Sequence, residues 1–200
     1  MKTLLSIALA AVLAISLAGC GKDAQAPAAP LVFNGKDITG ASFAREFALT
    51  DHNGKARTLA DFKGKLVVLF FGYTQCPDAC PTTMAELAGV MKALGPQADQ
   101  VQVLFITVDP ERDTPALLAQ YVPNFDKRFL GLWGDATATA KVAQEFRVFY
   151  AKAEGAKGNN YLIDHTTGSY VFDRAGKVRL FETRDLGVAQ VTQDLRQLLR

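Results

Sequence analysis

An uninterrupted apolar run over residues 66–71 (LVVLFF) is followed within ten residues by two cysteines, Cys76 and Cys80. Six large apolar residues in succession predict a β-strand buried on both faces, which requires a sheet covered by helices on both sides. Behind the cysteines, apolar residues recur at helical spacing from Met84 to Leu94, where Gly95-Pro96 ends the pattern. The sequence therefore predicts a strand, a dithiol loop and a helix in direct succession.

The rest of the chain alternates between strand and helix patterns. A hairpin is expected over 43–59, strands over 101–108, 129–133, 148–151 and 161–164, a second hairpin over 169–181, and a last helix over 188–199. Asp113 and Asp135 are expected to cap two further helices. This alternation predicts an α/β domain with a central, mostly parallel sheet, helices on both faces and a C-terminal hairpin plus helix. A strand, two cysteines and a helix in this order is the layout of a thioredoxin-like domain.

The first nineteen residues are typical of an export signal. One positive charge precedes an apolar stretch too short to cross a bilayer comfortably. Leu17-Ala18-Gly19-Cys20 looks like a bacterial lipobox, whose cysteine is lipidated, and a transmembrane anchor with an incidental cysteine is the alternative. We expect a signal peptide over 1–19, a lipidated Cys20 and flexible tether over 20–33, and a thioredoxin-like domain over 34–200. The domain is then exported, lipid-anchored to the cell membrane, and faces the periplasm or the cell exterior.

The charge balance argues against a nucleic-acid partner. The chain has 22 Lys and Arg against 20 Asp and Glu, with no basic run longer than two residues. Nucleic-acid binding requires a concentrated cationic face, which this composition does not provide. With 49% hydrophobic residues the chain is expected to bury a sizeable core. Only three cysteines and two histidines are present, so metal or thiol chemistry depends on very few side chains.

Three kinds of chemistry are open to Cys76 and Cys80 in an oxidising compartment: a structural disulfide, a redox pair or a metal site. Both cysteines precede prolines, and Pro81 fits the first helical position, which would make Cys80 a helix cap. The positive end of that helix would favour thiolate over thiol. Asp78, between the cysteines, would oppose this effect by raising the thiol pKa. A disulfide closing so short a loop would stabilise the fold little.

Two features distinguish metal binding from thioredoxin-type redox chemistry. Three residues separate the cysteines, whereas thioredoxin-type enzymes have two. Those enzymes also place a cis-proline against the dithiol, but the last proline here is Pro123, and the matching segment offers His165 instead. Two thiolates and an imidazole are a compact, soft ligand set that suits copper in either oxidation state and would accept zinc. The other histidine, His52, lies in a polar turn and is assigned no role.

These motifs together resemble the Sco/SenC family of copper-binding, thioredoxin-fold assembly proteins. The matching segments are Phe71–Thr74, Cys76–Pro81, Val108–Thr114 and Asp164–Thr166, within a likeness that covers about residues 40 to 195. The resemblance implies that Cys76, Cys80 and His165 bind one copper ion, as Cu(I) or Cu(II). One position departs from the pattern: many members have histidine immediately before the first cysteine, where this chain has Gln75, which offers no soft imidazole ligand.

The resemblance also implies a function, that of a membrane-anchored copper metallochaperone in assembly of the dinuclear copper site of cytochrome c oxidase subunit II. Subunit II is then the expected partner, with other periplasmic copper chaperones or thiol reductants as further candidates. One alternative is a thiol–disulfide oxidoreductase, in which Cys76 attacks an oxidised subunit II site and Cys80 resolves the mixed disulfide. A copper or redox sensor is the other. Whether the protein is an enzyme depends on this choice.

Charged residues near the cysteines have two interpretations each. Asp109 follows the second buried strand, where its carboxylate either orients the site or meets a partner, or only forms an Asp-Pro turn. Asp78 is the other candidate neighbour of the ligands. Arg112, Arg174 and Arg179 are expected to be solvated surface residues.

Overall fold

The computed structural model describes residues 30–153, 158 and 160–200. The expected signal peptide, Cys20 and most of the expected tether lie outside the described residues. Within the described part of the chain, no helix combines the length and the apolar character needed to cross a membrane.

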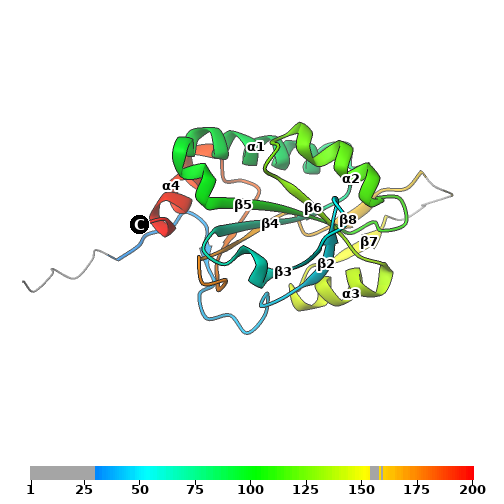
Figure 1. Cartoon of the computed structure of the whole chain (residues 1–200), viewed down its shortest axis with the longest axis horizontal. Coiled ribbons are helices and arrows are strands. Elements are labelled where there is room, and N and C mark those ends of the chain that lie inside the picture. Colours follow the sequence, from blue (N-terminus) through cyan, green and yellow to red (C-terminus); the bar gives the residue numbers. More distant parts are fainter. Residues whose placement is uncertain (1–29, 154–157, 159) are drawn as a thin grey trace, which may run out of the picture. The chain divides into compact units, whose positions relative to one another are not determined.

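The buried run after residue 65 forms the central strand of an eight-stranded sheet (Figure 1). From one edge to the other, the strands are β1 (Lys36–Asp37), β10 (Val178–Glu182), β9 (Ser169–Phe172), β4 (Leu66–Gly72), β5 (Val101–Thr107), β6 (Leu130–Trp133), β2 (Ala48–Asp51) and β3 (Ala56–Thr58). All seven residues of β4 and of β5 are buried. The prediction of strands covered on both faces is confirmed for this pair.

In the described part of the chain, four α-helices pack around the sheet. They are α1 (Ala79–Leu94), α2 (Pro115–Tyr121), α3 (Ala136–Glu145) and α4 (Val188–Leu198). Helices α1 and α2 lie on one side of the sheet and α3 lies on the other (Figure 1), and α4 packs against α1. Asp135 caps α3 as predicted, because its side chain accepts a hydrogen bond from the Ala138 N–H at 2.7 Å. The predicted α/β class is confirmed.

Parallel pairing is confined to the centre of the sheet. Strand β5 runs parallel to β4 and to β6, whereas the other five strand pairs are antiparallel. The expectation of a mostly parallel sheet therefore holds for β4, β5 and β6 and not for the flanks. The segments that contain α1 and α2 are long enough to cross over between the central strands, whereas tight turns at 52–55 and 173–177 make β2–β3 and β9–β10 antiparallel hairpins.

A separate two-stranded sheet carries the C-terminal part of the predicted site. It consists of β7 (Tyr150–Lys152) and β8 (Ile163–His165), which pair antiparallel. Among the described residues, neither strand joins the ladder of the eight-stranded sheet. The position of this hairpin therefore depends on side-chain contacts.

Two carboxyl groups are buried between the β10 edge of the sheet and α4. Asp194 accepts hydrogen bonds from the Asn34 and Gly35 N–H groups at 2.9 and 2.8 Å. Glu182 lies beside it at the end of β10. Burial, together with the neighbouring Asp194, raises the pKa of Glu182 from 4.5 to about 8.

This shift predicts that stability falls with rising pH. A carboxyl whose pKa is higher in the folded state favours folding fully below pH 4.5 and loses that contribution as the pH rises through about 8. We expect the free energy of unfolding to decline over this window by at most about 1.4 kcal/mol per pH unit from Glu182. Urea titrations between these pH values should find the decline removed in Glu182→Gln and retained in the exposed control Glu46→Gln. An unchanged slope in Glu182→Gln would contradict the assignment.

Candidate metal centre

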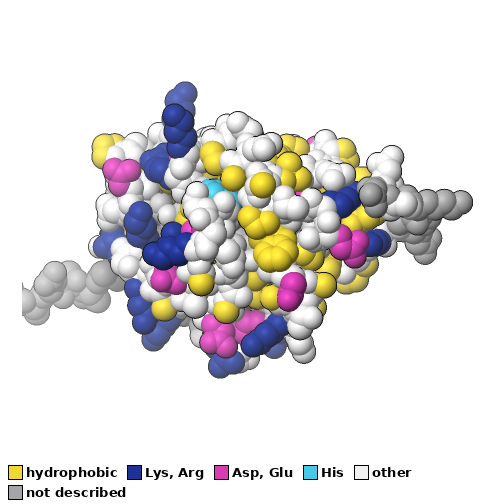
Figure 2. Space-filling view, turned by 45° about the vertical axis from the view of Figure 1, so that its right-hand side comes forward, with side chains coloured by type: hydrophobic (Ala, Val, Ile, Leu, Met, Phe, Trp, Pro, Cys, Tyr) yellow, Lys and Arg dark blue, Asp and Glu magenta, His cyan; other side chains and the backbone are white. Residues whose placement is uncertain are grey.

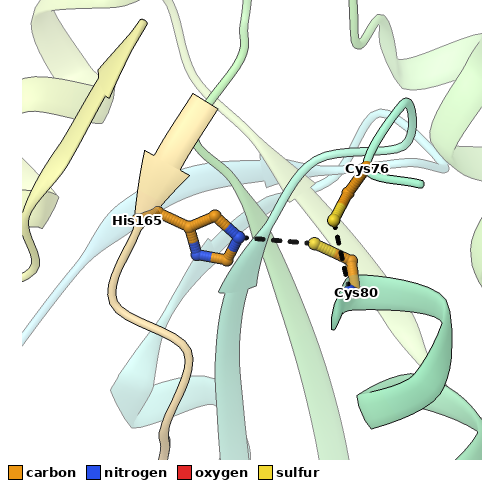
Figure 3. Close-up of side chains that lie close together, drawn as sticks. All are labelled: Cys76, Cys80 and His165. Atoms are coloured by element: carbon orange, nitrogen blue, oxygen red, sulfur yellow. Dashed lines mark hydrogen bonds between the residues drawn. The ribbon is translucent and has the colours of Figure 1, made fainter. Parts of the chain in front are cut away.

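Cys76, Cys80 and His165 converge at one point beyond the carboxyl end of β4 (Figure 3). Cys76 lies in the loop after β4, Cys80 lies in the first turn of α1, and His165 is the last residue of β8. Their three ligand atoms all lie within 4.8 Å of one another. The structure thus brings together the two sulfurs and the imidazole that lies 85 residues away along the chain.

A glycine at the end of β4 leaves space for the dithiol. A Cβ at Gly72 would lie 3.0 Å from the Cys80 sulfur and 2.9 Å from both the Phe70 and the Phe105 rings. Any side chain at this position would therefore displace the sulfur or the core aromatics.

Helix α1 begins earlier than the sequence predicted. Asp78 is the N-cap and Cys80 is the second helical residue, so the prediction that Cys80 caps the helix is wrong. The Thr82 N–H already donates to the Asp78 carbonyl at 3.1 Å, which closes the first helical turn around Cys80. The Cys80 N–H, one of the unpaired donors of this turn, points to the Cys76 sulfur at 3.4 Å. One helix N-terminal donor is thus directed at the first cysteine.

The two cysteines differ in exposure, and burial changes the pKa of Cys80. Both are free thiols, with Cys80 buried and Cys76 partly exposed. Burial raises the pKa of the Cys80 thiol, and the neighbouring Cys76 and Asp113 add to the rise. The expectation that the helix end keeps Cys80 as a thiolate is therefore wrong, because desolvation outweighs the backbone donors. A cation at this position would compensate the charge of the Cys80 thiolate.

His165 presents a free nitrogen lone pair to the sulfurs. Its Nδ1 lies 2.9 Å from the Thr166 carbonyl oxygen, which can only accept, so Nδ1 carries the proton. Nε2 then points its lone pair at the Cys80 sulfur, 3.4 Å away (Figure 3). Burial lowers the pKa of His165, which keeps the ring neutral. The rings of Tyr73 and Phe70 pack edge-on against the imidazole, with centroids 5.9 and 6.2 Å away.

This donor set fits a soft metal ion. Two sulfurs and one imidazole nitrogen are the ligands preferred by copper and also accepted by zinc. Their mutual separations, none above 4.8 Å, are compatible with metal–ligand bonds of about 2.0–2.3 Å. The hydrogen bond from Nδ1 to Thr166 is the kind of outer contact that orients a ligating histidine.

Asp113 holds the loop that leads to the cysteines. It is fully buried and accepts hydrogen bonds from the Thr74 N–H, the Thr74 hydroxyl and the Thr107 hydroxyl, at 3.0, 2.5 and 2.7 Å. The prediction that Asp113 caps α2 is wrong, since Thr114 is the N-cap and accepts from the Leu117 N–H. The Asp113 carboxylate points into the protein, where these three hydrogen-bond donors lie within reach of its oxygens.

Asp109 lies in the turn after β5, where its side chain contacts Arg112 and Tyr161. Its side chain is 2% exposed, forms an ion pair with Arg112 and accepts from the Tyr161 hydroxyl at 2.8 Å. The prediction that Arg112 is a solvated surface residue is wrong: its side chain is 8% exposed. A buried carboxylate requires a compensating charge, and Arg112 provides it.

The remaining predicted residues lie at the periphery. Asp78 is exposed and pairs with Arg184 at 3.3 Å. Arg174 is exposed and Arg179 is partly buried. His52 has a structural contact, because its Nδ1 accepts the Gly131 N–H at 3.0 Å.

Apolar side chains are exposed on the hairpin that carries His165. Phe149 precedes β7 and is 64% exposed, and Leu162 precedes β8 and is 50% exposed. Figure 2 shows one face of the molecule on which hydrophobic side chains gather near the middle and charged side chains lie mainly toward the margins.

Sequence reasoning missed Arg112 and the tyrosines around it. The Tyr73 hydroxyl accepts the Ile163 N–H at the start of β8, and Tyr161 stacks on Arg112. The available signal was the position of Arg112, within three residues of Asp109 in a turn that directly follows a buried strand. A carboxylate and a guanidinium at this spacing are able to pair, but the pattern does not reveal what covers them.

The comparisons with known proteins agree with this geometry. A family model described as SCO1/SenC matches residues 35–200. Among solved structures, Bradyrhizobium japonicum ScoI with copper bound is 42% identical, with a TM-score of 0.71, over 76% of this chain and 97% of that one. The apo Sco1 protein from Thermus thermophilus is 38% identical, with a TM-score of 0.75, over 84% of this chain and 97% of that one.

A mitochondrial relative is also similar in sequence. The protein SCO2 homolog of Bos taurus is 40% identical over 154 residues, which are 76% of this chain. The matched region spans 58% of the bovine protein's length.

Proposed function

The chain belongs to the SCO1/SenC family, and on that basis we propose that it is a copper metallochaperone of cytochrome c oxidase assembly. Cys76, Cys80 and His165 would bind one copper ion. The convergence of their ligand atoms within 4.8 Å supports this proposal most strongly. The ScoI proteins of Bradyrhizobium japonicum and Arabidopsis thaliana, 42% and 32% identical to this chain, have been solved with copper bound.

The two oxidation states of copper would use the site differently. Cu(I) is satisfied by the two soft sulfurs, whereas Cu(II) requires the imidazole as well. Cys76 is partly exposed, so an incoming thiolate of an acceptor would reach the metal from its side while Cys80 stays buried. This asymmetry is what a protein needs if copper is its cargo and must leave again.

The acceptor we propose is the dinuclear copper site of subunit II, which follows from the family resemblance. We also propose that the domain is exported and lipid-anchored through Cys20. The lipobox-like end of the first nineteen residues supports this part of the proposal.

Thiol–disulfide exchange is a second candidate function, favoured by the unequal exposure of the two cysteines. The Cys76 thiolate would attack a disulfide of the acceptor and release one acceptor thiolate. The Cys80 sulfur, after losing its proton, would then attack Cys76 in the mixed disulfide and release the second. The acceptor gains two electrons, and this protein ends with a Cys76–Cys80 disulfide.

A transfer experiment distinguishes the two functions. Copper-loaded protein is mixed with the copper-free, reduced copper domain of subunit II, and copper-free reduced protein is mixed with the oxidised form of that domain. We expect transfer of up to one copper per chain in the first mixture, lost in Cys76→Ser and retained in His52→Ala. Copper that stays on this protein, together with reduction in the second mixture, would reject the chaperone function in favour of the reductase.

A further inference from the structure

Arg112 lies between the two segments that carry the proposed ligands. On one side, its NH1 group donates to the Gln75 side-chain oxygen at 3.3 Å, next to Cys76. On the other side, the same group donates to the Tyr161 carbonyl at 2.8 Å, at the start of the β8 segment. Its Nε forms an ion pair with the buried Asp109, and this pair holds the guanidinium in place. One side chain thus connects the dithiol loop to the hairpin of His165.

The Tyr161 ring is held between two cations. The Arg112 guanidinium lies 3.5 Å from the ring centroid and the Lys152 ammonium lies 4.3 Å from it. The Tyr161 hydroxyl donates to Asp109 at 2.8 Å and lies 3.2 Å from Glu111, which itself pairs with Lys152 at 2.8 Å. These contacts attach the hairpin to the turn after β5.

Tyr73 continues this connection to the imidazole. The Arg112 guanidinium lies 5.7 Å from the Tyr73 ring centroid. The Tyr73 hydroxyl accepts the Ile163 N–H at 3.1 Å, and the ring packs edge-on against His165. A two-stranded hairpin adds little stability of its own, and β7–β8 makes no ladder with the main sheet among the described residues, so these contacts help to position it.

We propose that Arg112 is a positioning residue for the metal centre: it holds the β7–β8 hairpin against the dithiol loop, so that the Nε2 atom of His165 faces the two sulfurs. This inference rests on the proposed copper binding at Cys76, Cys80 and His165. Arg112 does not bind the metal and acts only through His165.

The first test is copper affinity in Arg112→Met, which keeps the length of the side chain and removes its charge and donors. We expect Cu(II) affinity to fall by ~10-fold, the lower end of the range for loss of a direct outer contact of a ligand, because Arg112 reaches His165 only through Tyr161 and Tyr73. Cu(I) affinity should change little. The matched control is Arg128→Met, since Arg128 also pairs with an aspartate, Asp126, but on the surface and through two hydrogen bonds. In a His165→Ala background, Arg112→Met should have no further effect on Cu(II) affinity.

The second test needs no copper. Amide hydrogen exchange at Ile163 and Thr166 should accelerate in Arg112→Met and remain at the wild-type rate in Arg128→Met. Arg112→Lys keeps a cation near Tyr161, so the variant should fold. Its side chain cannot reach Gln75, Asp109 and the Tyr161 carbonyl together, so the same effects on affinity and exchange should appear with smaller magnitude. It therefore replaces Arg112→Met if loss of the charge prevents folding.

The outcomes separate this inference from the proposed function. A wild-type protein that binds no copper would reject the function, while the exchange experiment would still test the role of Arg112. Wild-type exchange rates at Ile163 and Thr166 in the Arg112 variants would overturn the inference. An equal loss of Cu(II) affinity in the presence and in the absence of His165 would overturn it as well.

Discussion

His165→Ala should weaken Cu(II) binding by ~100-fold or more, beyond the range seen when only an outer contact of a ligand is lost. The reason is that Nε2 is the one nitrogen donor beside the two sulfurs among the described residues, and Cu(II) prefers imidazole to a shell of thiolates alone. Cu(I) affinity should fall much less, since Cys76 and Cys80 remain. The free energy of unfolding should fall modestly while the fold persists, because the substitution removes the edge-on contacts of the imidazole with Tyr73 and Phe70.

Competition titrations against chelators of known affinity would measure both oxidation states. The sulfur-to-copper charge-transfer absorption should shift in His165→Ala, reporting the changed ligand shell directly. His52→Ala is the control, because His52 contacts Gly131 in the β2–β6 region and has no role at the site. Equal Cu(II) affinity in His165→Ala and in the wild type would remove His165 from the ligand set.

Asp113→Ala should have the largest effect on stability. The substitution leaves the part-buried Thr74 N–H and hydroxyl and the buried Thr107 hydroxyl without their acceptor. Each unsatisfied buried donor costs about 1–3 kcal/mol, so the free energy of unfolding should fall by roughly 3 kcal/mol or more. Copper affinity should fall too, because Thr74 starts the loop that positions Cys76.

Urea denaturation monitored by circular dichroism would measure this change. Asp135→Ala is the matched control: Asp135 also accepts from a backbone N–H, at the exposed start of α3, and its loss should cost about 1 kcal/mol. Copper affinity in the control should equal that of the wild type. If Asp113→Ala lost no more stability than Asp135→Ala, the buried network would not stabilise the fold as described.

Local sequence patterns were sufficient for the core of the fold. The apolar runs at β4 and β5 predicted strands buried on both faces, and Asp135 predicted the start of α3, because burial and capping depend on residues close in the chain. The direction of the flanking strands was less accessible. It depends on which strands become neighbours, and this is decided by connections of the whole chain.

The site was predictable to a different degree at each residue. The spacing of Cys76 and Cys80 at the start of a predicted helix places the two sulfurs near each other, whereas His165 joined them through its predicted place in a thioredoxin-like fold and through the resemblance to a known family. The inward turn of Asp113 and the burial of Arg112 were not predictable. Both lie in a polar segment whose sequence is typical of the surface. They are buried because the loop after β4 packs against Asp113 and the β7–β8 hairpin packs against Arg112.

X-ray absorption spectroscopy of the Cu(II)-loaded protein would examine the ligand set itself. For one copper per chain, we predict a shell of two sulfurs and one imidazole nitrogen, with the sulfur signal lost in the Cys76→Ala/Cys80→Ala double variant and the imidazole signal lost in His165→Ala. A shell without sulfur, or an imidazole signal that persists in His165→Ala, would contradict the site described here.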